Sequence, residues 1–171
     1  MKVNREKEHF LVLPEDDANR QIVLGFINDL NVDNSAIQVL PIADGWKKAV
    51  DQLTINDGLR LRQYPQRRII LIIDFDKKEN RLSYVESQIP KDLKERVFVL
   101  GVQSNPQKLK NEIKKSLEDI GKALAQDCSD NTNELWGHKL LTHNKTELER
   151  MVSSVKPFLF KKIDPKVAHT T

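Results

Sequence analysis

Residues 68–76, Arg-Ile-Ile-Leu-Ile-Ile-Asp-Phe-Asp, decide the fold. The five consecutive apolar residues 69–73 are typical of a strand buried on both faces, as in the middle of a parallel sheet. The run stops at Asp74 and Asp76, whose side chains should point the same way if the extended geometry persists. Two neighbouring carboxylates repel each other unless a cation or several donors lie between them. The stretch therefore predicts an acidic, divalent-metal site at the carboxyl end of a buried strand, the edge where open α/β sheets bind ligands.

Other apolar runs predict more strands, with helical patterns between them. We expect strands at residues 10–13, 37–42, 69–73 and 97–100, and helices at 18–30, after Gly45, at 80–89 and at 107–126. Asn56-Asp57-Gly58 predicts a turn. This alternation predicts a doubly wound α/β fold, with a mostly parallel four-stranded, Rossmann-like sheet covered by helices on both faces.

The last part of the chain differs from the strand–helix repeats before it. A polar loop at residues 129–133 precedes two expected short helices, 134–141 and 145–155. We divide the chain into an α/β domain, residues 1–128, and a helical C-terminal extension, residues 129–171, packed on the same domain. The last ten or so residues are expected to be loosely held.

Composition is that of an ordinary globular protein. The 171 residues are 39% hydrophobic and 31% charged, and a net charge of +3 does not by itself predict nucleic-acid binding. The single cysteine, Cys128, excludes an internal disulfide. The first eight residues are too charged for a signal peptide, and no apolar run approaches membrane-spanning length. We expect a cytoplasmic protein with no membrane partner.

Three features converge on one edge of the predicted sheet. Acidic residues 15–17 follow the first strand, a turn at Gly45 follows the second, and Asp74 and Asp76 follow the third. The pattern resembles the TOPRIM domain of topoisomerases, bacterial primases and several nucleases, over roughly residues 9–105. That family has a glutamate after its first strand and an Asp-x-Asp after its third, which together hold magnesium for phosphodiester chemistry.

The resemblance implies a metal-binding and catalytic set of Glu15, Asp74 and Asp76, with Mg²⁺ or Mn²⁺ as the cofactor. The family usually has a glycine after the glutamate, whereas this chain continues with Asp16 and Asp17. Either of these two aspartates is an alternative to Glu15 as a metal ligand. Carboxylates suit this role because hard cations bind oxygen ligands.

The implied activity is hydrolysis or nucleotidyl transfer at a nucleic-acid phosphodiester. Neither Tyr64 nor Tyr84 lies in the predicted site loops, so water is favoured over a protein nucleophile. Basic residues near the third strand are expected to hold the phosphate backbone: Arg67, Arg68, Lys77 and Lys78. Residues 100–107 and 135–138 also resemble the tail of small stand-alone bacterial proteins, a likeness that implies one self-contained unit but no activity.

Two alternatives remain open. Over residues 10–26, where acidic residues lead into an amphipathic helix, the chain resembles the start of a response-regulator receiver domain, with Asp74 as the phosphoryl acceptor and Ser104 in place of the family's hydroxyl residue. The glycine turn that normally follows the acceptor is absent. In the other alternative, the domain is a non-catalytic module that binds a partner protein or nucleic acid. The sequence does not specify an oligomeric state.

Overall fold

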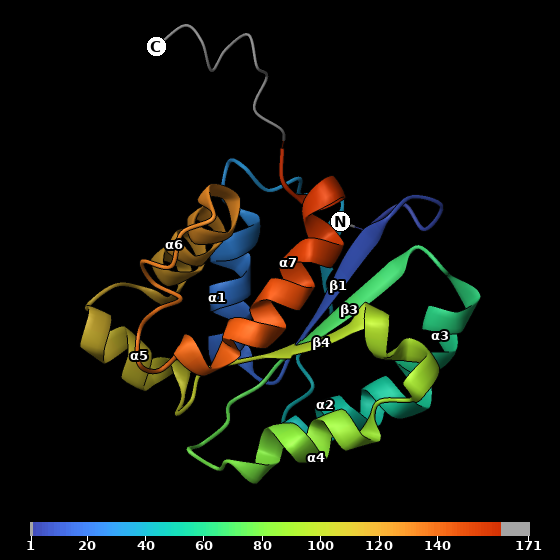
Figure 1. The fold of residues 1–171 in the computed structure, drawn as a ribbon, viewed down its shortest axis with the longest axis horizontal. Helices are drawn as coiled ribbons and strands as arrows, with labels where there is room; N and C mark the ends of the chain where they lie inside the picture. The colour runs from blue at the N-terminus through green and yellow to red at the C-terminus, as the bar shows by residue number, and fades with distance from the viewer. Residues whose placement is uncertain (1, 162–171) are drawn as a thin grey trace, which may run out of the picture.

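The computed structural model describes residues 2–161, which form a four-stranded sheet between two layers of helices (Figure 1). The strands are β1 (His9–Pro14), β2 (Ile37–Val39), β3 (Arg67–Ile72) and β4 (Val97–Leu100). Their order is β2-β1-β3-β4, and every pair is parallel. The prediction of a doubly wound α/β fold is therefore confirmed, although β2 ends at Val39, earlier than expected.

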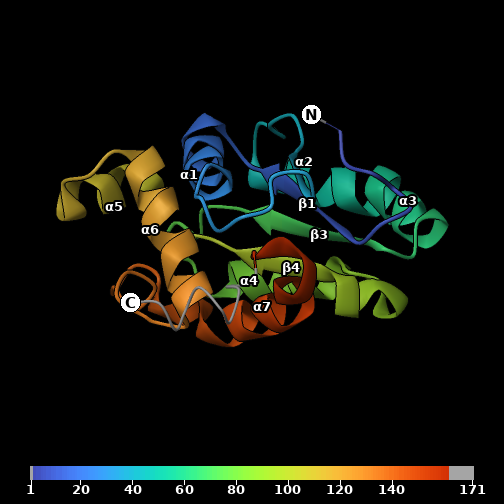
Figure 2. The same ribbon diagram turned by 90° about the horizontal axis from the view of Figure 1, so that it is seen from above.

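Helices cover both faces of this sheet, as the view in Figure 2 also shows. One face carries α1 (Asp17–Ile27), α5 (Pro106–Ile113), α6 (Leu117–Asp130) and α7 (Lys145–Leu159), with the 3₁₀ turn η3 (Thr142–Asn144) before α7. The other face carries α2 (Trp46–Gln52), the π-helical turn η1 (Leu53–Asp57), α3 (Gly58–Gln63), α4 (Asn80–Gln88) and the 3₁₀ segment η2 (Lys91–Arg96). Between residues 2 and 161, no helix has both the length and the apolar character needed to cross a bilayer.

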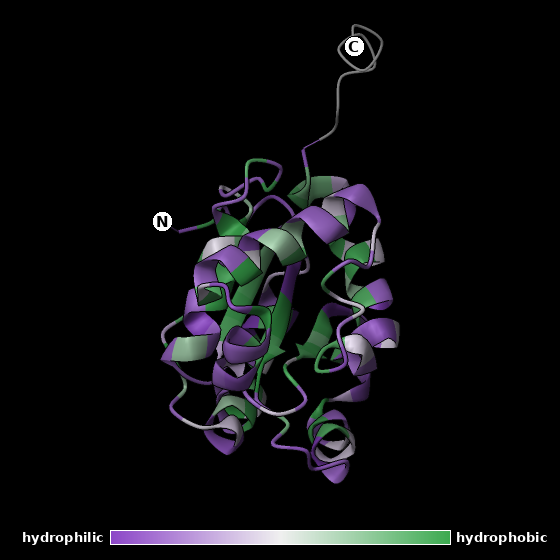
Figure 3. Ribbon diagram, turned by 90° about the vertical axis from the view of Figure 1, so that its left-hand side faces the viewer, coloured by the Kyte–Doolittle hydropathy of each residue, from purple (hydrophilic) through white to green (hydrophobic). Residues whose placement is uncertain are grey.

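Alternate residues of the central strands enter two separate cores. In β3, Ile70 packs under α1, α6 and α7, whereas Ile69 and Leu71 pack under α2, α3 and α4. Both sets are almost fully buried. This is why the run of isoleucines shows no alternation, and Figure 3 shows the resulting apolar sheet between helices of mixed polarity.

The C-terminal segment completes one of these cores. Trp136, Met151 and Val155 are buried in the same cluster as Phe10 and Ile70. The segment thus supplies part of the first helical layer.

The prediction of a helix at residues 134–141 is wrong, because these residues form turns. The buried carboxylate of Asp127 accepts the backbone N–H groups of Glu134, Leu135 and Trp136, at 3.3, 2.7 and 3.1 Å. A side chain therefore satisfies donors that the chain alone cannot pair in this short segment.

Two other local predictions also differ from the structure. The helix expected at residues 107–126 is two helices, because Lys114 adopts a left-handed conformation (φ 59°) and Ser116 caps α6 by accepting the N–H of Asp119. The turn expected at Asn56-Asp57-Gly58 lies within continuous helical structure from η1 into α3. There Gly58 has ordinary right-handed helical angles, so its capacity for other conformations is not used.

Candidate functional site

The candidate site lies where β1 and β3 end side by side. The helix after β1 covers one face of the sheet and the helix after β3 covers the other, so the two connections diverge at the position where such folds bind ligands. The β1–β3 ladder continues past the strands, since the N–H of Glu15 donates to the carbonyl of Ile72 at 2.9 Å. This pairing brings residue 15 close to Asp74.

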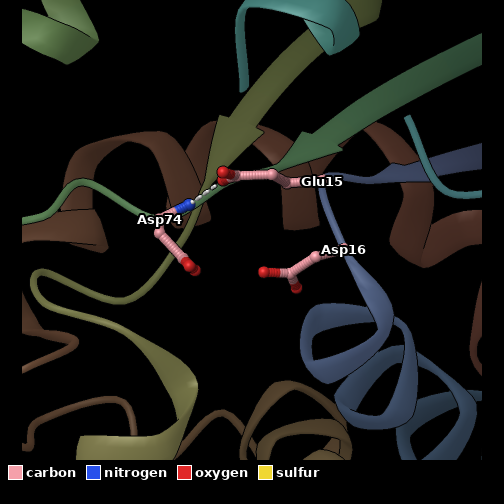
Figure 4. A group of neighbouring side chains, drawn as sticks. All are labelled: Glu15, Asp16 and Asp74. Carbon is pink, nitrogen blue, oxygen red and sulfur yellow. Dashed lines mark hydrogen bonds between the residues drawn. The ribbon is translucent and has the colours of Figure 1, made fainter. Parts of the chain in front are cut away.

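Three carboxylates meet at this point. Glu15 and Asp16 come from the end of β1, and Asp74 comes from the segment after β3 (Figure 4). Each offers an oxygen within 4.8 Å of the others. We call Glu15, Asp16 and Asp74 the acidic cluster.

Hydrogen bonds hold each carboxylate of the cluster by one oxygen. Glu15 Oε2 accepts the backbone N–H of Asp74 at 2.6 Å. The side-chain amide of Asn19 donates to Oδ1 of Asp16 and to Oδ1 of Asp74, both at 2.9 Å. Asp16 Oδ1 also caps α1 by accepting the N–H of Asn19 at 3.0 Å. The second oxygen of each carboxylate accepts no hydrogen bond from residues 2–161, so all three remain available to a ligand.

A close approach of the next loop fixes the segment that carries Asp74. Ile73 and Phe75 donate their N–H groups to Leu100 and Val102, both at 3.1 Å, so the chain stays extended through Phe75. A Cβ added at Gly101 would lie 1.7 Å from the carbonyl oxygen of Ile73. Only glycine fits there, and the loop after β4 consequently supports Asp74 from one side.

Burial and mutual repulsion make the acidic cluster electrostatically costly. Burial raises the pKa of Asp74 to about 7, and the charges of Glu15, Asp16 and Asp76 add to this effect against the opposing hydrogen bond from Asn19. Burial also raises the pKa of Glu15, more than its bond to the Asp74 N–H lowers it. A bound cation would remove this cost by stabilising the charged forms.

Asp76 and Asp17, which the sequence offered as ligands, lie outside the cluster. The extended chain ends at Asp76, where φ is 48°, and the Asp76 carboxylate accepts a hydrogen bond from Arg81 at 2.8 Å. Asp17 lies in the first turn of α1 and bonds Arg20 and Gln21. The observed set thus differs from the predicted Glu15–Asp74–Asp76 set, because the turn of the chain redirects Asp76.

The four predicted phosphate-binding residues lie at opposite ends of the sheet. Lys77 and Lys78 are exposed and directly follow Asp76, near the acidic cluster. Arg67 and Arg68 instead begin β3 at its amino end, where Arg67 is buried against His9 and Arg68 bonds Ser154 and Glu8. A strand of six residues spans roughly 20 Å. The two arginines therefore lie at the opposite end of the sheet from the acidic cluster.

Two residues important to the site were not predicted from the sequence. Asn19 is fully buried and links two of the carboxylates. Arg81 is buried in α4 and donates to the Asp74 carbonyl at 2.6 Å as well as to Asp76. The only sequence signal for Asn19 is its position three residues after the helix cap. Arg81 lies on a helix whose sequence looks exposed, and no pattern there indicates that this arginine is buried.

Comparisons of the chain with protein-family models, curated proteins and solved structures found no match. The chemistry open to the site follows from its own groups. Three crowded carboxylates with free oxygens suit a hard divalent cation, and Asp74 with a pKa of about 7 can gain or lose a proton near neutrality.

Proposed function

We propose that this protein is a cytoplasmic, TOPRIM-like enzyme that uses a divalent cation to hydrolyse a nucleic-acid phosphodiester. The observation that carries the proposal is the convergence of Glu15, Asp16 and Asp74 at the carboxyl ends of β1 and β3. Asp16 also caps α1, but capping does not require Glu15 and Asp74 to lie beside it, and burial and crowding raise the pKa of both.

The donor set fits Mg²⁺ or Mn²⁺. Both ions prefer carboxylate oxygens and keep several waters, and the cluster offers one free oxygen from each of three carboxylates. An ion bound there would supply Lewis-acid polarisation of a phosphoryl oxygen and activation of a water. Asn19 fixes the orientation of two of the ligands before any ion arrives.

The surrounding residues suit an anionic substrate. The exposed Lys77 and Lys78 follow the acidic segment, and the ammonium group of Lys77 lies close enough to Lys108 to lower the pKa of Lys108. Two adjacent ammonium groups repel each other, so a phosphate between them relieves that repulsion. In hydrolysis, water gives its hydroxyl to phosphorus and its proton to the leaving oxygen, while Glu15, Asp16 and Asp74 would hold the ion as ionised carboxylates.

A nuclease assay with matched aspartate variants tests this function. Single- and double-stranded DNA and RNA are incubated with the wild type, Asp74→Asn and Asp51→Asn, in Mg²⁺, Mn²⁺ or a chelator. Asp51 is an exposed residue of α2, so its variant makes the same chemical change away from the cluster. We expect cleavage that needs the metal, falls by about two orders of magnitude in Asp74→Asn and is unchanged in Asp51→Asn. Equal cleavage by the wild type and Asp74→Asn would leave only a non-catalytic binding module.

A second candidate is a receiver-like phosphoryl acceptor. The observation that favours it is the composition of the cluster, an adjacent Glu15–Asp16 pair facing a single Asp74. Against it, the described sheet has four strands with no fifth beyond β4. Incubation with radiolabelled acetyl phosphate and Mg²⁺ separates the two candidates, because only the acceptor would retain an acid-stable, base-labile label that Asp74→Asn abolishes.

A further inference from the structure

Next to the acidic cluster, an open pocket of about 430 Å³ lies between α2 and α4. Its lining combines two aromatic rings with three cationic side chains and contains no carboxylate: Trp46, Lys47, Lys78, Asn80, Arg81 and Tyr84. We call this the aromatic–cationic pocket. Its size is within the range of small-ligand sites.

The aromatic rings are arranged as a partly open platform. Trp46 and Tyr84 meet edge to face, with ring centroids 5.7 Å apart. Trp46 is half-buried against the core below, and Arg81 lies over its ring at 4.5 Å. Tyr84 is 47% exposed, and its hydroxyl forms no hydrogen bond with residues 2–161. Contact with the core therefore accounts for the position of Trp46, whereas Tyr84 is left partly exposed and available to a flat ligand.

The cations around the rings favour an anionic partner. Lys47 lies over the Trp46 ring at 5.6 Å, and Arg81 of α4 and Lys78, which precedes α4, line the opposite side of the pocket. The Asp76 carboxylate accepts a hydrogen bond from Nη1 of Arg81. The Nε of Arg81 is buried without a hydrogen-bond partner in the described part of the chain. A ligand with a flat ring and a negative charge matches this lining, and a nucleotide has both.

Backbone contacts tie the pocket to the acidic cluster. Arg81, which lines the pocket, donates to the Asp74 carbonyl at 2.6 Å. On the other side, Asp44 and Gly45 donate their N–H groups to the carbonyl of Glu15 at 2.8 and 3.2 Å, immediately before Trp46. The two sites thus share their supporting residues and are neighbours on the same edge of the sheet.

We propose that the aromatic–cationic pocket binds one nucleotide of a single-stranded nucleic acid, with the base stacked on Tyr84 and the phosphate next to Lys47 and Lys78. This assignment rests on the proposed function, since it names single strands as the substrate class of the neighbouring cluster. A single strand is required because a base within a duplex has no free face to stack on the ring.

Binding without metal tests the pocket separately from cleavage. A labelled thymidine oligonucleotide of about 12 residues and an abasic strand with the same phosphates are titrated in a chelator by fluorescence anisotropy. The proteins are the wild type, Tyr84→Ala, Tyr84→Phe and Leu59→Ala. Leu59 is an exposed apolar residue of α3, 66% exposed and outside the pocket, so its variant controls for the loss of a surface side chain.

We expect the wild type to bind the thymidine strand about tenfold or more tightly than the abasic strand. Tyr84→Ala should lose this difference, whereas Tyr84→Phe and Leu59→Ala should keep it. Equal binding of the two strands by the wild type, no binding of either, or an undiminished difference in a folded Tyr84→Ala protein would overturn the proposal. Base-dependent binding without any metal-dependent cleavage would support the pocket while refuting the proposed hydrolysis.

Discussion

The two ends of the sheet hold buried charge with different partners. At the amino end, Arg67 is 5% exposed, yet its Nε donates to His9 at 2.9 Å and its guanidinium lies 4.8 Å from the Tyr64 ring centroid. Burial and the nearby arginines lower the pKa of His9, so its ring is neutral and can accept this bond. At the carboxyl end, no carboxylate of the acidic cluster forms an ion pair with a residue of the described chain, although the charge of the nearby Arg81 partly offsets the burial that raises the pKa of Glu15.

The difference separates structural charge from charge available for function. At the amino end, Arg67 is held by a hydrogen bond to the His9 ring and by the face of Tyr64, and burial together with the charge of Arg5 lowers its pKa. At the carboxyl end, Asn19 orients the carboxylates of Asp16 and Asp74 but does not neutralise them. The sequence shows both ends as clusters of charged residues, and only the partners distinguish them.

The largest effect is expected from removing the buried cation at the amino end. Arg67→Ala should lower the free energy of unfolding by about 3 kcal/mol, because it leaves a void and a buried His9 without its donor. Arg68→Ala, at the next position of β3, should cost about 1 kcal/mol or less, since its partner Glu8 is exposed to water. Urea unfolding at neutral pH measures both values. Equal losses would contradict the structural role assigned to the amino end.

In the acidic cluster, removing a charge should instead stabilise the protein. The pKa of Asp74 is about 7 in the folded chain and near 3.8 in the unfolded one, so ionisation of Asp74 opposes folding. The penalty is absent near pH 3, accumulates between about pH 4 and 7, and is complete above pH 7. Asp74→Asn should therefore raise the free energy of unfolding by about 2 kcal/mol at pH 8 in a chelator, and by less at pH 5.

Urea unfolding at the two pH values checks this prediction, with Asp51→Asn as the exposed control. If Asp74→Asn lowered the free energy of unfolding at pH 8, the ionised Asp74 carboxylate would have to be stabilised by its neighbours, contrary to the account.

The smallest effect is expected from Asp76, which lies beside the cluster but is paired with Arg81. Asp76→Asn should change the Mn²⁺ affinity by less than about threefold, because its carboxylate is half exposed and directed at Arg81. Competition of Mn²⁺ with a fluorescent chelator gives the affinity. A tenfold or greater loss of Mn²⁺ affinity would show that Asp76 belongs to the metal site, as the predicted Asp-x-Asp arrangement requires.

The fold was predictable because its signals are strong and local. A run such as residues 69–73 has no stable alternative to a buried strand, and four such runs leave few topologies. The breaks within the helical layer were not predictable, because Lys114 takes a left-handed conformation that usually marks glycine. The cap at Ser116, with acidic residues following it, was an available signal for the start of α6.

Two members of the acidic cluster, Glu15 and Asp74, were predictable on the same grounds, and Asp16 was an alternative ligand in the sequence. Glu15 and Asp74 follow directly from parallel strands ending at one edge. Asp76 departs from the prediction because period-two alternation holds only while the chain stays extended, and two successive left-handed residues, Asp76 and Lys77, end it. Asn19 acts through a contact with Asp74 that spans 55 positions of sequence, which no local pattern reveals.

Calorimetric titration of Mn²⁺ tests the central claim, that the acidic cluster binds a divalent cation, most directly. The wild type at pH 8 should bind one ion per chain, Asp51→Asn should match it, and Asp74→Asn should bind at least tenfold more weakly. Because Asp74 must lose its proton, the wild-type affinity should fall about tenfold between pH 8 and pH 6. Absence of binding at millimolar Mn²⁺, or equal affinities for the wild type and Asp74→Asn, would contradict the account.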